Sequence, residues 1–162
     1  TLITASALLD LVSEAWIAQL LRRLRVPFYA ALSYVGHMEW TPGDPRDAVV
    51  AAAFDRHQGG DKGFGPALGP AAAERCVGLL EAAGFTVETA PSPWRLGSDQ
   101  VALQRALVEG VATAAAEAGA EDAVAWGACR RELAIHTRCT IGHLDLLAIP
   151  GGHPREVPHA PR

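Results

Sequence analysis

A glycine-rich stretch, residues 59–70, surrounds the only lysine of the chain. It reads GGDKGFGPALGP and carries Gly63, Gly65 and Gly69 in a GxGxxxG spacing around Lys62. A dinucleotide-binding loop needs a strand before its first glycine, and a Walker loop needs Ser or Thr after its lysine. Here a helix is expected before the stretch, and Gly63 follows Lys62. The pattern predicts a lid or a substrate wall with one cation, and a flexible helix connection is the alternative.

Histidine and aspartate side chains form two further groups. The sequence GHLD puts His143 and Asp145 on one face of an expected strand, and His153 follows, which is the outline of a two-histidine, one-carboxylate metal site. A structural His–Asp hydrogen bond is the interpretation we favour, so we expect no metal. A second set, which we interpret as a solvated helix end, comprises Asp55, His57 and Asp61.

Tryptophan and cysteine residues add little chemistry of their own. Trp16, Trp40 and Trp94 each lie near an expected strand-to-helix connection, where packing in the core or at a hinge competes with ligand contact. No GxSxG motif is present, and Cys139 falls inside a strand pattern, which argues against nucleophilic hydrolysis.

Composition limits the partners. With 49% hydrophobic residues the 162-residue chain can bury a core, and its net charge of −4 without a long basic run excludes a nucleic-acid-binding surface. The three cysteines show no CxxC spacing, which favours free thiols in the cytoplasm. No apolar run is long enough for a membrane span. Small molecules or proteins are therefore the expected partners.

The elements that must position these residues alternate between strand and helix. Expected strands cover residues 1–6, 27–34, 85–90 and 137–150, and expected helices cover 13–25, 46–58, 70–84 and 122–134. A further helix, capped by Ser98 or Asp99, is expected to carry Leu103, Leu107 and Val111 on one face. Residues 37–45 and 91–97 are expected to be loops. This order predicts one layered α/β domain, 1–150, followed by a flexible tail, 151–162, with ligands at the carboxyl ends of the parallel strands.

Three stretches resemble a known family. TLITASALLDLVSEAWIAQLLRRL, PFYAALSYVGHMEWTPGDPRDAVVAAAFDRHQGGDKGFGPALGPAAAERCVGLLEAAGF and TAPSPWRLGSDQVALQRALVEG are similar to the C-terminal half of bacterial class I S-adenosylmethionine-dependent methyltransferases. The resemblance runs from Thr1 to about Pro150. It implies a partial Rossmann-like sheet made of the fourth to seventh strands, with the last strand antiparallel between the fifth and sixth, and with helices on both faces.

The resemblance also implies that part of the cofactor site is missing. The family's glycine-rich loop after its first strand, and the acidic residue after its second, have no counterpart in this chain. We therefore expect the chain alone to be inactive and to need an N-terminal half before it can use S-adenosylmethionine. The unpaired strand TLITAS would then be an exposed sheet edge, and we expect a dimer, a larger assembly or pairing with that half.

Residue roles follow from the resemblance by position. The residues expected to approach the cofactor are Thr4, Ala5 and Ser6. Those expected on the substrate side are Trp16, Lys62, Phe64, Gly65 and Trp94. Asp10, which would face the cleft, and His57 are the candidates for the base that removes the substrate proton.

The sequence thus predicts methyl transfer to a small molecule by in-line displacement, with the enzyme mainly orienting the reactants. Two other classes stay open. One is a binding or assembly module that uses no cofactor, and the other is a metal-dependent enzyme that uses His143 and Asp145.

Overall fold

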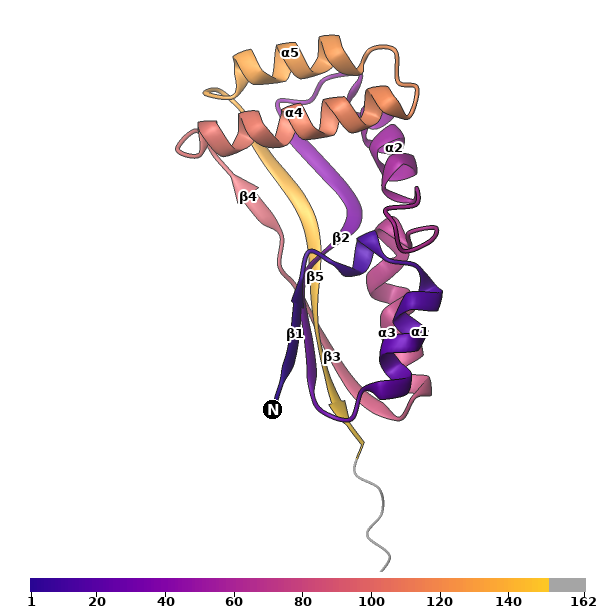
Figure 1. Cartoon of the computed structure of the whole chain (residues 1–162). Helices are drawn as coiled ribbons and strands as arrows, with labels where there is room; N and C mark the ends of the chain where they lie inside the picture. The colour runs from indigo at the N-terminus through magenta and orange to yellow at the C-terminus, as the bar shows by residue number, and fades with distance from the viewer. Residues whose placement is uncertain (152–162) are drawn as a thin grey trace, which may run out of the picture.

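The structure is a computed structural model that describes residues 1–151, and it is a mixed α/β fold with a curled sheet (Figure 1). Its strands are β1 (Ile3–Ser6), β2 (Phe28–Thr41), β3 (Phe85–Pro91), β4 (Trp94–Leu96) and β5 (Arg138–Pro150). Its α-helices are α1 (Glu14–Arg23), α2 (Asp47–Gln58), α3 (Ala72–Ala82), α4 (Val101–Glu117) and α5 (Ala123–Leu133), with short 3-10 helices η1 (Leu9–Leu11) and η2 (Gly69–Ala71). The α/β class is confirmed. The tail expected from residue 151 lies, from residue 152 onward, outside the described residues.

The sheet has the strand order β1-β2-β5-β3, and β4 also pairs with β5. β1 is parallel to β2, whereas β5 is antiparallel to both β2 and β3. The last strand therefore lies between β2 and β3 and runs against them. β3 is at the edge of the sheet, as its alternating pattern indicates.

Two expected loops are partly strand. Residues 37–41 continue β2, because Met38 to Thr41 pair with Ile141 to Arg138 of β5. This continuation follows a register shift around Gly36, whose φ of +73° suits glycine. In the second loop, Trp94 to Leu96 form β4 against the same end of β5. In both segments the strand conformation depends on pairing with β5, which is distant in sequence. The local turn residues predicted a loop instead.

Helices lie on both faces of the sheet, but over opposite ends of it. β5 pairs with β3 and β4 in one continuous register, so its successive residues alternate between the faces. Leu146 and Ala148 belong to the core built with α1 and α3, whereas Cys139 and Ile141 belong to the core built with α2, α4 and α5. Figure 1 shows these two groups of helices at the two ends of the long strands.

One part of the sheet has no helix over it within residues 1–151. On the face that carries Cys139 and Ile141, the strands continue past α4 and α5 to Leu147, Ile149 and Tyr29. These side chains are half-buried or exposed, with Ile149 45% accessible. β1 has β2 as its only partner strand there, so its outer edge is unpaired. This open face and edge adjoin the strand ends where the site lies.

A buried ionic cluster joins α5 to the start of α2. The side chain of Arg130 is only 1% exposed and contacts the Asp47 carboxylate, the Pro42 carbonyl and the face of Trp40. Trp126 Nε1 donates to the same carboxylate at 2.7 Å. The buried charge of Arg130 is thus paired, as burial requires, whereas the buried indole N–H of Trp40 has no acceptor among residues 1–151.

Candidate functional site

Two strained residues lie side by side, one at the carboxyl end of β1 and one in the adjoining part of β2. Ala7, directly after β1, has φ +48°, and Leu32, within β2, has φ +56°. The Ala7 N–H donates to the Ala31 carbonyl at 3.0 Å, so the two positions adjoin. Left-handed conformations cost non-glycine residues roughly 1–2 kcal/mol. Strained backbone conformations are enriched at ligand and active sites, so this end of β1 is a candidate site.

Asp145 holds the strained segment of β2 in place. Its carboxylate accepts hydrogen bonds from the Leu32 N–H, at 2.9 Å, and from the hydroxyls of Tyr29 and Ser92. Burial is the largest single influence and raises the pKa of Asp145. The hydrogen bonds from Ser92, Tyr29 and Leu32 together outweigh it, so the pKa is lowered. The expected hydrogen bond between Asp145 and His143 is wrong: within residues 1–151 the partners of Asp145 are these three groups. Asp145 therefore has a structural role, as predicted, but it stabilises the segment of β2 around Leu32 and does not bond His143.

A polar cluster lies between η1, β2, α2 and β5; we call it the Asp10 cluster, and it comprises Asp10, Tyr34, Asp55, Trp94 and His143. The Tyr34 hydroxyl donates to Asp55 Oδ1 at 2.9 Å. The ring of Tyr34 is 6.3 Å from the imidazole of His143, and Trp94 packs against that imidazole at 5.1 Å. Asp10 is close enough to act electrostatically on both Tyr34 and His143.

Burial shifts each titratable group of the cluster toward its neutral form. It raises the pKa of Asp10, which proximity to His143 only partly opposes, and it raises the pKa of Asp55 against the bond from Tyr34. Burial likewise lowers the pKa of His143, against the pull of Asp10. Tyr34, buried beside both carboxylates, has its pKa raised strongly. Groups whose pKa values are displaced in this way are typical of acid–base and binding sites.

Two polar atoms of the Asp10 cluster lack a protein partner. Asp10 is 6% exposed, yet its Oδ1 has no hydrogen-bond partner, and neither has the buried Nδ1 of His143. Buried polar atoms in native proteins are almost always bonded, to protein, water or ligand. These two atoms are therefore the ones in the cluster to which a ligand could bond.

The glycine-rich loop forms a second group with the end of α2. His57 Nδ1 is 3.2 Å from Lys62 Nζ, and His57 Nε2 is 2.9 Å from the Glu117 carboxylate. Because Lys62 can only donate, His57 Nδ1 is the acceptor and Nε2 carries the proton. The only lysine is thus tied to α2 and α4 through His57.

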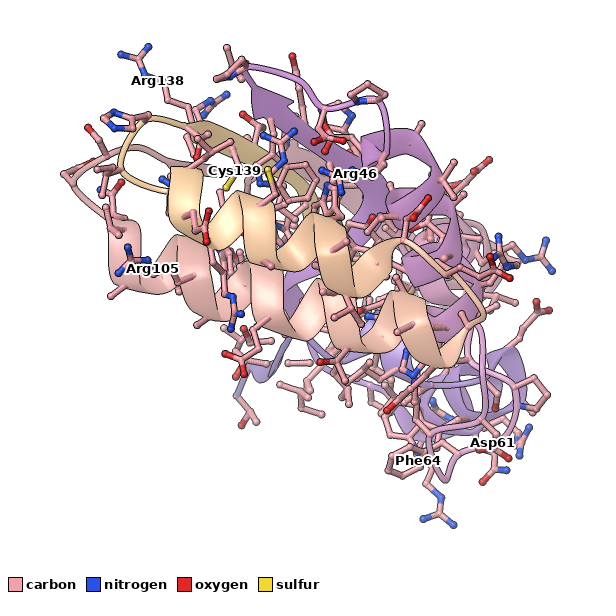
Figure 2. The ribbon with its side chains drawn as sticks, turned by 90° about the horizontal axis from the view of Figure 1, so that it is seen from above. Arg46, Asp61, Phe64, Arg105, Arg138 and Cys139 are labelled. Carbon is pink, nitrogen blue, oxygen red and sulfur yellow. The ribbon has the colours of Figure 1, made fainter. Side chains whose placement is uncertain are left out.

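The tip of the loop packs on the start of α1. Phe64 meets Trp16 edge to face at 6.2 Å, and a Cβ on Gly65 would lie 3.3 Å from the Ser13 hydroxyl. Asp61 accepts from the N–H groups of Gly63 and Gly65 and so shapes the turn. Figure 2 shows Asp61 and Phe64 on this loop, at the opposite end of the molecule from Arg105 and Arg138. The loop forms a wall beside η1.

The residues expected to approach the cofactor do not share a face. Thr4 and Ser6 are exposed and, by register, lie on the open face beside Tyr29 and Ala31. Ala5 points to the other face and packs in the core of α1 and α3. Of the three residues, only Thr4 and Ser6 have side chains that a ligand on the open face can contact.

The sequence-predicted residues fall into separate groups. Asp10 and Trp94 meet in the Asp10 cluster, whereas His57 meets Lys62, and Trp16 meets Phe64. The two base candidates, Asp10 and His57, are in different groups. Asp55, interpreted as part of a solvated helix end, is instead half-buried against Tyr34, and that interpretation is wrong for it. Tyr34 gave no signal, because its place in an apolar run resembles ordinary core.

Volume alone does not locate the site. A surface hollow of about 610 Å³ lies at the opposite ends of β2 and β3, lined by residues such as Leu24, Arg25 and Phe85. It contains none of the residues named above. The unpartnered polar atoms and the adjoining left-handed residues favour the Asp10 cluster over this hollow.

Comparison with protein-family models and with curated proteins found no match. Among the described residues, no helix combines the length and the apolar character needed to cross a bilayer.

Proposed function

We propose that this chain is the C-terminal half of a class I S-adenosylmethionine-dependent methyltransferase that acts on a small molecule. The observation that carries the proposal is the strand order. In the family the seventh strand runs antiparallel between the fifth and the sixth, and here β5 runs antiparallel between β2 and β3. An order of this kind is not required by local sequence, so its agreement with the resemblance is informative.

The residues present fit one side of the cofactor only. Thr4 and Ser6 leave the open face beside β1 lined with small hydroxyl side chains, which a nucleoside or amino-acid group could contact. The groups that would hold methionine and ribose belong to the part of the family fold without counterpart here. Bound S-adenosylmethionine would supply an electrophilic sulfonium methyl group.

The chain's own residues would hold and deprotonate the acceptor. Asp10, with its raised pKa and its unpartnered oxygen, is the better candidate base, because His57 is already bonded to Lys62 and Glu117. The loop of residues 59–70 would form the wall of the acceptor site through Phe64.

Of the two alternatives, the metal-dependent enzyme is the weaker. Asp145 already accepts three hydrogen bonds, and residues 1–151 contain no group of three His, Cys, Asp or Glu side chains arranged to hold a metal. His153 lies outside the described residues. The cofactor-free binding module remains the alternative to test.

A cytoplasmic location, supported by the free thiols of Cys76, Cys129 and Cys139, belongs to the same proposal.

The test compares this chain with a longer chain that includes the residues encoded upstream. We expect calorimetric titration with S-adenosylhomocysteine to detect binding to the longer chain and none to the 162-residue chain. Micromolar binding to the 162-residue chain would contradict the half-site argument. No binding to the longer chain, or an upstream sequence without a glycine-rich loop after a strand, would favour the cofactor-free module.

A further inference from the structure

The Asp10 cluster holds two carboxyl groups that have no cationic partner among residues 1–151. Asp10 and Asp55 both lie next to Tyr34, and neither takes part in any ion pair among residues 1–151. The nearest basic group is His143, whose pKa is lowered, so it is neutral near pH 7. Buried carboxylates are normally paired with a cation or neutralised.

The walls of the cluster are aromatic. Tyr34 packs edge to face with Phe54 at 5.5 Å, and Trp94 covers His143. Aromatic faces beside carboxylates attract organic cations, because the ring quadrupole and the carboxylate act in the same direction. Small inorganic cations prefer several oxygen ligands at close range, and no such arrangement occurs in the described part of the chain.

The orphan atoms show where a ligand would bond. Asp10 Oδ1 is buried and lacks a donor, and His143 Nδ1 is buried and lacks a partner. An ammonium group carries several N–H donors, so it can supply the donor that Asp10 Oδ1 lacks. Trp94, His143 and Asp55 are half-buried, and a ligand would enter from their side.

We propose that the Asp10 cluster binds a small organic amine, with its ammonium group on Asp10 and its apolar body against Trp94 and Tyr34. This inference rests on the proposed function in one respect only: there, the amine is the methyl acceptor. Asp10 and Asp55 select the cation, and the aromatic rings select its body.

The test uses three probes: phenethylamine, benzylamine and cyclohexylamine. Each is compared by calorimetry with its neutral counterpart, namely 2-phenylethanol, benzyl alcohol and cyclohexanol. We expect at least one amine to bind the 162-residue chain about tenfold or more tightly than its alcohol, since a hydrogen bond between charged groups is worth more than a neutral one. Asp10→Asn should remove that preference. The matched control is Glu121→Gln, because Glu121 is an exposed acid far from the cluster in sequence.

The outcomes separate the two proposals. If Asp10→Asn does not fold, Asp55→Asn serves in its place, with folding checked by circular dichroism. Equal binding of amines and alcohols, no binding of any amine, or undiminished preference in a folded Asp10→Asn or Asp55→Asn variant would overturn the amine site. Amine binding by a longer chain that does not bind S-adenosylhomocysteine would keep the amine site and remove methyl transfer.

Discussion

Replacing Asp47 by alanine should destabilise the protein more than loss of an ordinary surface carboxylate. The substitution removes the acceptor for two nitrogens of Arg130 and for the indole N–H of Trp126, and leaves Arg130 with the Pro42 carbonyl. The guanidinium stays 1% exposed unless the packing opens. A buried cation without its counter-charge is the largest cost in this change.

The magnitude follows from burial. Removing one partner of a buried ion pair costs about 3–5 kcal/mol, and an unsatisfied indole N–H adds about 1–3 kcal/mol. Asp47 itself is 20% exposed, so water can replace part of what is lost. We therefore expect about 3–4 kcal/mol in total, which for a chain of this size is a fall in Tm of roughly 6–16 °C.

Urea denaturation followed by tryptophan fluorescence measures the effect, because Trp40 and Trp126 both pack in this cluster. The double variant Asp47→Ala, Arg130→Met should be more stable than Asp47→Ala alone, since it removes the uncompensated charge. Asp122→Ala, at an exposed carboxylate, is the control. A loss below about 1 kcal/mol in Asp47→Ala, or a double variant less stable than both single variants, would refute the buried-charge reasoning.

Four other outcomes follow from the structure. Gly127→Ala should destabilise the fold by roughly 1–3 kcal/mol, because the added Cβ would lie 2.7 Å from the Cβ of Ala112. Gly110→Ala, which has open space around it, should instead raise the free energy of unfolding by about 0.5–1 kcal/mol in the same melting assay. Asp10→Asn should gain stability relative to the wild type as the pH rises from below 3.8 to 7–8, because the raised pKa of Asp10 means that the unfolded chain loses this proton first; a stability difference that does not change with pH would contradict this. Lys62→Ala should lower turnover of the longer chain with little change in Tm, since a half-buried loop lysine bonded to one histidine contributes little to folding. Light scattering of the 162-residue chain should report a dimer or larger species, because the edge of β1 is unpaired, and a stable monomer would argue against that edge as an association site.

Local patterns predicted most elements because each carries its own signals. Ser13 caps α1 by accepting from the Trp16 N–H at 3.2 Å, as its place before the apolar stripe indicates. The cap expected for α4 was wrong, because the helix begins at Val101 after Gln100, without a side-chain cap bond. The far end of β2 and all of β4 also escaped prediction. Their strand character comes from pairing with residues of β5 distant in sequence, which no local window contains.

The candidate site was harder to predict than the fold. Asp10 was singled out only through the family resemblance, and nothing in its neighbourhood LLDLV marks a buried acid. Tyr34 and Asp55 are separated by a loop and most of a helix, and their hydrogen bond depends on how α2 turns back toward β2. His143 was noticed for its spacing to Asp145, yet its contacts are with Trp94 and Tyr34. Spacing along a strand gives the face of a side chain but not the partners that other elements supply.

The Arg130 cluster and the Asp10 cluster differ in how completely their polar groups are paired, which separates a structural role from a binding role. Around Arg130 the guanidinium is paired with Asp47 and bonded to the Pro42 carbonyl, so its charge is satisfied and joins α2 to α5, although the buried indole N–H of Trp40 has no acceptor. Around Asp10 a buried oxygen has no donor, and two residues in left-handed conformations, Ala7 and Leu32, lie side by side after β1 and within β2. A fold selected for stability alone would lose little by replacing Asp10 with an apolar residue. The unsatisfied carboxylate is therefore best explained by a partner that supplies the missing donor.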